Sequence, residues 1–394
     1  MYFGMQNKLL SFGGIKFNSS RRELEDMAHK ILWVAPRLNH YKVRQLNEFS
    51  SQVHGMKVLH GSTRESEGHK MPQRIDFHFN HIQVNCTKKN FGWNIAVYRE
   101  ILRELRHNDF KIVLMPMEKK HLLTILFLYV MKHLFKFRLA SYNHHYRQRN
   151  SQTYRLHSFF DRKTVYLLIR LYDIVVYYTE NGMHRSISEK MVDARRAFFV
   201  SNTIDVESIF RIVNGNDIMP ENNILFIARI IPSKRVDILL EYFQEIKKRS
   251  KDSRLFIIGG GHGAEQYKNI SEGIEDVCWL GGIVEEETIA KYMNISKIVF
   301  VPGASGLSIV HSFAYKKPYV TLNLERHGPE IDYLVDGKNG LILPFDDKEN
   351  NISKIVRLLT DDAYYNRMSA AAYEMAKKLT LENWVISMRN ALQV

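Results

Sequence analysis

Two stretches of the chain carry residue types that suit the binding of a diphosphate. The first reads FIARIIPSKRV (226–236), where a buried strand ends at Arg229 and Lys234 stands at the start of the next helix. At the carboxyl end of a parallel strand, an Arg can hold a diphosphate through its planar fork and a Lys can act as a point charge. A pair of solvated surface cations would give the same pattern.

The second stretch reads VFVPGASGLSIVHSFAYKKPYV (299–320) and predicts one strand–turn–helix–strand unit. An apolar strand ends at Pro302, and a turn of small residues follows from Gly303 to Gly306. Apolar residues from Leu307 onward then have helical spacing, and Pro318 stops the helix because it has no N–H to donate. The N–H groups and the dipole at the start of a helix favour an anion. A tight turn without a ligand fits the same sequence.

A third stretch, SYNHHYRQR (141–149), directly follows a predicted strand and therefore lies at the edge of the first sheet. His144 or His145 could hydrogen-bond a sugar or act near a reacting group. Arg147 and Arg149 could help to bind an anionic acceptor. Surface histidines in a basic loop are the alternative.

Apolar runs alternate with amphipathic segments along the whole chain, which predicts an α/β protein with doubly wound parallel sheets. The polar stretches 214–217 and 220–223 are the expected linker. They divide the chain into domains at 1–215 and 216–380, with a terminal helix over 381–394 that could pack near the linker. Residues 1–29 are expected to be an irregular lead-in. Strands are predicted at 30–36, 56–60, 75–84, 111–116, 137–142, 174–178, 197–200, 224–228, 255–258, 277–280 and 319–322, and helices at 43–53, 93–106, 121–135, 163–171, 236–249, 285–293 and 381–392.

The 394 residues carry a net charge of +14, and this charge is concentrated in the first half. Residues 1–215 hold 34 Lys and Arg against 18 Asp and Glu, whereas residues 216–394 hold 22 against 24. A basic half suits an anionic partner such as a membrane surface, a phosphorylated substrate or a nucleic acid. Nucleic acid is not expected as a partner, because no aromatic-basic recognition motif accompanies the charge, and a nucleic-acid-binding protein is therefore the weaker alternative. Solvated surface charge without a partner remains the alternative.

The longest apolar run, Leu122–Met131, is about half the length needed to span a bilayer. With no secretory signal and two distant cysteines, Cys86 and Cys278, the sequence predicts a cytoplasmic protein. Lys132, His133, Lys136 and Arg138 follow the apolar run, so this segment could dock on an anionic membrane surface. A helix buried against the sheet is the alternative.

Five segments of the second half occur in the order seen in the retaining glycosyltransferases of family 4, which have the GT-B fold. They read FIARIIPSK, LFIIGGGHG, CWLGGIVEEETIAKYMNISKIVFVPG, GLSIVHSFAYKKPYVT and GPEIDYLVDGKNGLILP. The resemblance covers residues 224–344 well. It extends more weakly over the first half, through YYTENGMHR and VSNTID.

The resemblance implies two Rossmann-like domains that face each other across a cleft. It also implies a hexosyltransferase-type enzyme that retains the anomeric configuration and needs neither metal nor cofactor. The donor would be a nucleotide sugar and the acceptor a glycan or a lipid-linked molecule, as in surface polysaccharide synthesis, with peripheral contact at the inner face of the cell membrane. In the donor site, Arg229 and Lys234 would bind the diphosphate, and Ile283 would lie beside the nucleobase. Backbone contacts to the donor would come from Gly303, Ser305, Gly306 and Leu307. His144 or His145 would be the catalytic histidine near the sugar.

The chain departs from the family pattern at two positions. The family usually carries two glutamates separated by seven residues, the first facing the donor sugar and the second the ribose. This sequence has Gly303 and His311 in those places. His311 could still hydrogen-bond a ribose hydroxyl, but Gly303 cannot replace a carboxylate. A catalytically degenerate nucleotide-sugar-binding protein is therefore the alternative to an enzyme.

Overall fold

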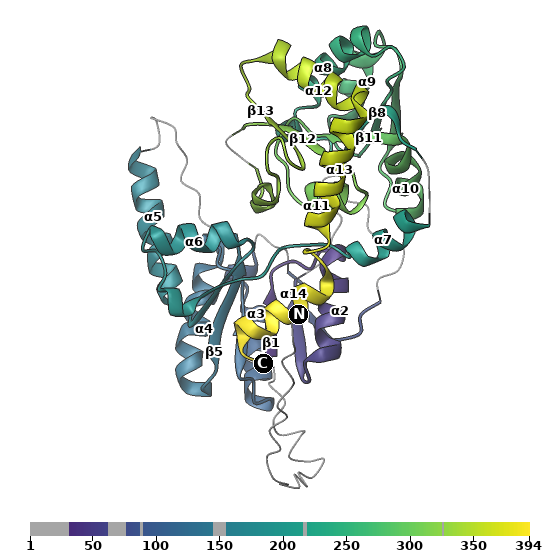
Figure 1. Ribbon diagram of the computed structural model, residues 1–394. Helices are drawn as coiled ribbons and strands as arrows, with labels where there is room; N and C mark the ends of the chain where they lie inside the picture. The colour runs from purple at the N-terminus through teal and green to yellow at the C-terminus, as the bar shows by residue number, and fades with distance from the viewer. Residues whose placement is uncertain (1–30, 62–75, 87–89, 145–154, 216–218, 325–326) are drawn as a thin grey trace, which may run out of the picture.

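The computed structural model describes residues 31–61, 76–86, 90–144, 155–215, 219–324 and 327–394, and it contains two parallel sheets (Figure 1). The lead-in expected over 1–29 lies outside the described residues. The prediction of a doubly wound α/β architecture is confirmed. In each sheet the first strand of the domain is the third strand from one edge, and the chain winds outward from it in both directions.

The first sheet has the strand order β3-β2-β1-β4-β5-β6-β7, and every recorded strand pair is parallel. Its central strand ILWVA is buried along its whole length, as expected for a strand covered by helices on both faces. The strands are β1 (Ile31–Ala35), β2 (Met56–His60), β3 (Asn80–Gln83), β4 (Ile112–Leu114), β5 (Arg138–Asn143), β6 (Ile174–Tyr177) and β7 (Ala197–Phe199).

Helices cover both faces of this sheet, and the alternation of side chains along β1 shows how. Leu32 and Val34 pack on one face with side chains of α3, α4 and α5, whereas Trp33 packs on the other face with α2 and α14. The helices of this part are α2 (His40–Gln52), α3 (Ile95–His107), α4 (Leu122–Phe135), α5 (Arg155–Arg170) and α6 (Glu180–Ser188), with the short 3-10 turns η1 (Phe91–Trp93), η2 (Lys119–His121) and η4 (Ala194–Arg196).

The second sheet has the order β10-β9-β8-β11-β12-β13 and is also parallel in every recorded pair. Its strands are β8 (Glu221–Ile227), β9 (Leu255–Ile258), β10 (Val277–Gly281), β11 (Ser296–Phe300), β12 (Tyr319–Leu322) and β13 (Gly340–Leu343). Its helices are α7 (Val206–Asn214), α8 (Val236–Arg249), α9 (Ala264–Ser271), α10 (Glu286–Ile295), α11 (Ser308–Ala314), α12 (Lys348–Thr360) and α13 (Asp362–Ala376), with 3-10 turns η5 (Pro232–Lys234) and η6 (Pro329–Tyr333).

The chain crosses between the two cores twice. Val200 belongs to the first core and Val206 to the second, so α7 already packs with the second sheet although it lies before residue 216. The second crossing follows α13. Helix α14 (Leu381–Leu392) then lies on the first domain beside α2 (Figure 1), and it also contacts β6 and β7.

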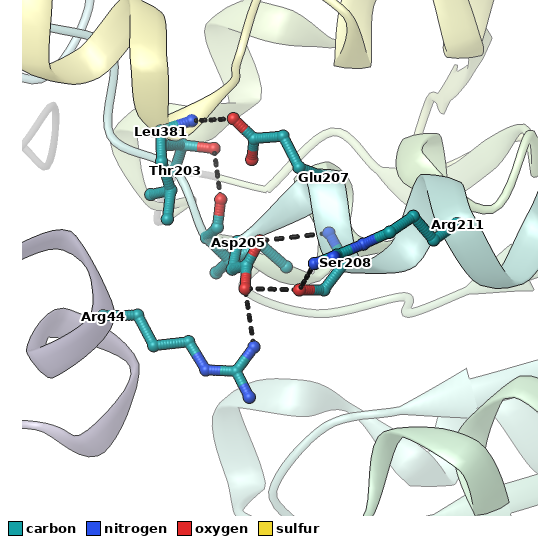
Figure 2. Close-up of polar contacts among 8 residues, drawn as sticks. Arg44, Thr203, Asp205, Glu207, Ser208, Arg211 and Leu381 are labelled. Atoms are coloured by element: carbon teal, nitrogen blue, oxygen red, sulfur yellow. Dashed lines mark hydrogen bonds and ion pairs between the residues drawn. The ribbon is translucent and has the colours of Figure 1, made fainter. Parts of the chain in front are cut away.

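Helix α14 completes the core of the first domain. Trp384 stacks on Trp33 with ring centroids 6.4 Å apart, and its indole N–H donates to the Tyr142 hydroxyl at 3.0 Å. Close to the crossing, the Leu381 N–H donates to Glu207 at 2.7 Å (Figure 2). The last helix therefore ties the first sheet to the start of α7.

Several predicted elements have different bounds in the structure. Helix α5 begins eight residues before position 163, and strand β3 is limited to Asn80–Gln83 within the predicted 75–84. Helices α6, α7, α9, α12 and α13 were not predicted. Among the described residues, no helix is long and apolar enough to cross a bilayer.

Candidate functional site

The segments that follow β8 and β11 lie side by side, because these two strands are neighbours in the second sheet. Arg229 comes two residues after β8, and Lys234 ends the 3-10 turn η5. The Lys234 ammonium donates to the carbonyl oxygen of Ala304, in the turn after β11. The structure thus brings the two predicted phosphate-binding stretches together at the carboxyl edge of the sheet.

The Lys234 ammonium is buried beside a second cation, Arg229. Burial and the neighbouring Arg229 guanidinium lower the pKa of Lys234 to about 8, although the Glu330 carboxylate acts in the opposite direction. A bound diphosphate would neutralise both cations and remove their mutual repulsion. The arrangement is suited to an anionic ligand.

Gly303 is required by a close approach of two backbone segments. A Cβ atom at position 303 would lie 2.1 Å from the carbonyl oxygen of Ser233 and 2.5 Å from the carbonyl carbon of Lys234. The Gly303 N–H donates to Lys234 O at 3.1 Å, and the Ala304 N–H donates to Ser233 O at 2.7 Å. Turn η5 therefore occupies the space that any side chain at 303 would need.

The turn from Gly303 to Leu307 uses several of its own polar groups internally. The Ser305 N–H donates to His327 Nδ1 at 3.2 Å, and the buried Ser305 hydroxyl lies 3.1 Å from the Thr321 hydroxyl. Together with the two bonds of the preceding segment, this occupies the N–H groups of 303, 304 and 305. A bound anion at this turn would have to use the N–H groups of Gly306 and Leu307.

His311 is engaged by a carboxylate from the neighbouring helix. Its Nε2 lies 2.8 Å from Glu286 Oε1, and the Tyr315 hydroxyl donates to the same oxygen at 2.7 Å. Burial alone would raise the pKa of Glu286, but the charge and hydrogen bond of His311, the Tyr315 hydroxyl and Arg44 outweigh it and lower this pKa to about 2. A carboxylate is therefore present beside position 311, supplied by α10. Ile283, half-buried, precedes this helix at the same edge of the sheet.

The first domain contributes polar side chains to the same region. His144 follows β5, is exposed, and its ring lies edge-on to Tyr178 at 6.4 Å between centroids. Lys42, in the first turn of α2, donates to the Tyr178 hydroxyl at 3.3 Å. His145, Arg147 and Arg149 lie outside the described residues.

Glu330 is a buried carboxyl group that the sequence analysis did not select, although it lies within the quoted motif GPEIDYLVDG. Asn202 of the first crossing donates to it at 2.5 Å. Burial raises the pKa of Glu330, while the Asn202 hydrogen bond and the nearby His144 and Lys42 side chains oppose the rise. Its acidic character and position in a matched motif were the available signals, but only the fold shows that it faces the first domain.

Turn η6, which carries Glu330, joins the second domain to the first. Thr179 donates to Asp332 at 2.6 Å, and the Tyr333 hydroxyl donates to the carbonyl oxygens of Tyr178 at 2.9 Å and Asn202 at 3.2 Å. The N–H of Gly328, just before η6, donates to Ser305 O at 2.5 Å. The turn after β11 is therefore linked through η6 to the strand ends of the first sheet.

A second polar network lies where the chain first crosses between the domains (Figure 2). Arg44 of α2 forms an ion pair with Asp205 at 2.6 Å, and Asp205 also accepts from the Ser208 N–H at 3.1 Å, at the start of α7.

Among the described residues, no group of three or more His, Cys, Asp or Glu side chains has a geometry that could hold a metal ion.

Comparison with known families identifies the second domain. Residues 211–375 match the family model described as glycosyl transferases group 1. This match confirms the resemblance of the five segments to glycosyltransferases, and the cationic pair, the Gly303 turn and Glu330 all lie within the matched residues.

Similar proteins of known sequence are glycosyltransferases. Over 203 residues the chain is 26% identical to the poly(ribitol-phosphate) alpha-N-acetylglucosaminyltransferase of Staphylococcus aureus. This aligned region covers 47% of this chain and 40% of that protein. It is 24% identical over 213 residues to the poly(glycerol-phosphate) alpha-glucosyltransferase of Bacillus subtilis, covering 50% of this chain and 30% of that protein. The chain thus spans about half or less of the length of these relatives.

Solved structures extend the likeness to the whole fold. A sucrose-phosphate synthase from Thermosynechococcus elongatus matches with a TM-score of 0.67 at 13% identity, over 93% of this chain and 98% of that one. Anabaena HepE in complex with UDP and glucose matches with a TM-score of 0.63 at 13% identity, over 93% and 99%. The two domains together therefore have the GT-B fold.

Proposed function

We propose that the chain transfers a sugar from a nucleotide-sugar donor to a glycan or lipid-linked acceptor, in the synthesis of a surface polysaccharide. The observation that carries the proposal is the contact of Lys234 with the Gly303 turn, with the Arg229 guanidinium close enough to lower the pKa of Lys234. Both cations lie at the carboxyl edge of the sheet, in the segment that matches the group 1 family. Retention of configuration, hexosyl transfer, independence of metal and contact with the inner face of the membrane belong to the same proposal.

In this proposal the diphosphate lies between the two cations. Arg229 and Lys234 supply fixed positive charge where negative charge develops as the sugar leaves, which stabilises the transition state more than the bound substrate. The N–H groups of Gly306 and Leu307 contact the same phosphates. The known complex of HepE with UDP and glucose makes a uridine nucleotide the first ligand to try.

The remaining predicted site residues surround this centre. Ile283 lies beside the nucleobase, and the Glu286–His311 pair offers hydrogen bonds to the ribose from the start of α10 and from α11. His144 or His145 approaches the sugar from the first domain, opposite Glu330. The acceptor binds on the side of the basic first domain, where charge favours an anionic or phosphate-linked molecule.

The test is a thermal-shift panel with UDP, GDP, CDP and ADP on the wild type, Arg229→Ala and Lys234→Ala. A ligand that binds only the folded protein raises its melting temperature. One nucleotide should stabilise the wild type and neither variant. Lys268→Ala, which removes an exposed cation of the same domain, is the matched control and should keep the shift. No shift with any nucleotide would overturn the proposed donor site.

A second candidate function is favoured by Gly303. The position of the family glutamate that faces the donor sugar has no side chain here, and the backbone of η5 fills its space. A nucleotide-sugar-binding protein without turnover would fit this geometry. Release of the free nucleotide from the donor, measured with a lipid-linked or polyol-phosphate acceptor, separates the two functions.

A further inference from the structure

Helix α4 in the first domain has two apolar sides. Ile125 and Leu128 are buried against the sheet. Leu122, Leu126, Val130 and Leu134 follow one another at intervals of four residues, so they form a line along another side of the helix, and all are exposed. Val130 is 55% exposed and Leu134 is 67% exposed, so these two side chains do not pack on the sheet.

Turn η1 adds to this apolar surface at the beginning of α4. The backbone of Gly92 lies so close to η2 that a Cβ there would be 2.4 Å from Lys120 O, and Tyr98 of α3 contacts Phe127 with ring centroids 5.2 Å apart. Trp93 is 70% exposed and Ile95 is 72% exposed. We call Trp93, Ile95, Leu122, Leu126, Val130 and Leu134 the outer α4 surface.

Cations outnumber carboxylates around the outer α4 surface, although Lys120 is paired with Glu118 and Arg103 with Glu100. Helix α4 contains no acidic residue, and Lys119, Lys120 and Lys136 stand at its two ends. The helices that share this face of the sheet, α3 and α5, expose basic side chains as well. These are Arg99, Arg103 and Arg106 on α3, and Lys163 and Arg170 on α5.

We propose that the outer α4 surface docks on a lipid bilayer that contains anionic lipid. An apolar helix side flanked by cations, with a Trp at one end, is the chemistry that inserts shallowly into the headgroup region while the cations meet anionic headgroups. Self-association through this surface is disfavoured, because a symmetric contact would bring the same cationic helices together. The proposal does not depend on donor binding in the second domain.

The experiment measures cosedimentation with vesicles of phosphatidylglycerol and phosphatidylcholine, and with vesicles of phosphatidylcholine alone. The full chain should bind the anionic vesicles at low salt and release with added salt. The variant Val130→Asp with Leu134→Asp should lose binding by more than about ten-fold, because two charges then enter the apolar contact. Ile270→Asp, at a 55% exposed apolar position on α9 of the second domain, is the matched control and should bind like the wild type.

A second readout locates the contact. Of the four tryptophans, Trp33 and Trp384 are buried in the first core and Trp93 is exposed. Brominated lipid should quench emission of the wild type, and most of this quenching should be absent in Trp93→Phe. Equal quenching in both proteins would place the contact elsewhere and overturn the proposal.

Other outcomes also decide the proposal. No binding to anionic vesicles at low salt, or undiminished binding by the double variant, would overturn it. So would a concentration-dependent dimer in sedimentation velocity that the double variant converts to a monomer, since a second copy would then cover this surface. The double variant should keep its melting temperature and its nucleotide shift, which separates this test from that of the donor site.

Discussion

Replacing Gly303 tests the close approach between η5 and the turn after β11. In Gly303→Ala the new methyl carbon would lie 2.1 Å from Ser233 O and 2.5 Å from the carbonyl carbon of Lys234. Both are backbone atoms, which cannot rotate away as a side chain could. Turn η5 must therefore move. That movement weakens the hydrogen bonds from the N–H groups of Gly303 and Ala304, at 3.1 and 2.7 Å.

The size of the effect follows from these two contributions. Overpacking a filled site costs about 1–3 kcal/mol, and two hydrogen bonds at about 1 kcal/mol each add about 2 kcal/mol. The expected loss in free energy of unfolding is thus about 3–5 kcal/mol. For a domain of this size, each kcal/mol lowers the melting temperature by about 2–4 °C. Gly303→Ala should melt about 6–20 °C below the wild type.

The assay is differential scanning calorimetry, with Gly306→Ala as the control from the same turn. A Cβ at position 306 would meet only Glu330 Oε2, at an ordinary contact distance of 3.5 Å, so this variant should melt close to the wild type. Gly303→Glu should be at least as destabilised as Gly303→Ala and should bind nucleotide more weakly. A Gly303→Ala protein as stable as Gly306→Ala, or a Gly303→Glu protein with increased transfer activity, would refute the reasoning.

Three further predictions follow from individual side chains. Nucleotide affinity should fall as the pH rises through about 8, because burial and Arg229 lower the pKa of Lys234 to that value and the neutral amine no longer attracts the diphosphate. Titration calorimetry between about pH 7 and 9 measures this change, and an affinity that does not vary with pH would contradict the prediction. Glu286→Gln should lower the melting temperature at neutral pH. The difference in melting temperature between variant and wild type should shrink as the pH falls from 4.5 toward about 2, because a carboxylate with a lowered pKa in the folded state loses its stabilising effect over that pH range. A difference that stays constant would contradict the ion pair with His311. Tyr333→Phe removes the one hydroxyl proton that is shared between the carbonyl oxygens of Tyr178 and Asn202, and it should cost about 1–2 kcal/mol. Denaturant unfolding measures this loss, and an unchanged midpoint would show that the Tyr333 hydroxyl does not help to hold the domains together.

Local patterns were sufficient for the alternation of strands and helices. The central strands are continuous apolar runs because parallel strands are covered on both faces, and this composition is visible without any contact information. Helix α8 and helix α14 have the bounds that were predicted from their apolar spacing alone. Arg229, Lys234 and the Gly303 turn could be selected because each follows a strand, and strand ends of a parallel sheet meet at one edge.

Contacts between distant residues could not be obtained in this way. The sequence shows a glycine at 303 and a histidine at 311 where a carboxylate is usual. Only the fold reveals that the backbone of η5 fills the first place and that Glu286 stands beside the second. Neither fact leaves a local pattern, because each depends on a partner that lies 20 or more positions away.

The same distinction applies to the whole molecule. The sequence by itself determined the α/β class, the GT-B likeness and the cationic pair, since these depend on residue type and on spacing within one element. Tertiary structure alone decided that Glu330 faces the first domain, that α14 returns to the first core, and that α4 exposes an apolar side. Each of these depends on which surfaces meet when the sheets and helices pack, and many sequences with the same local pattern would bring different surfaces together.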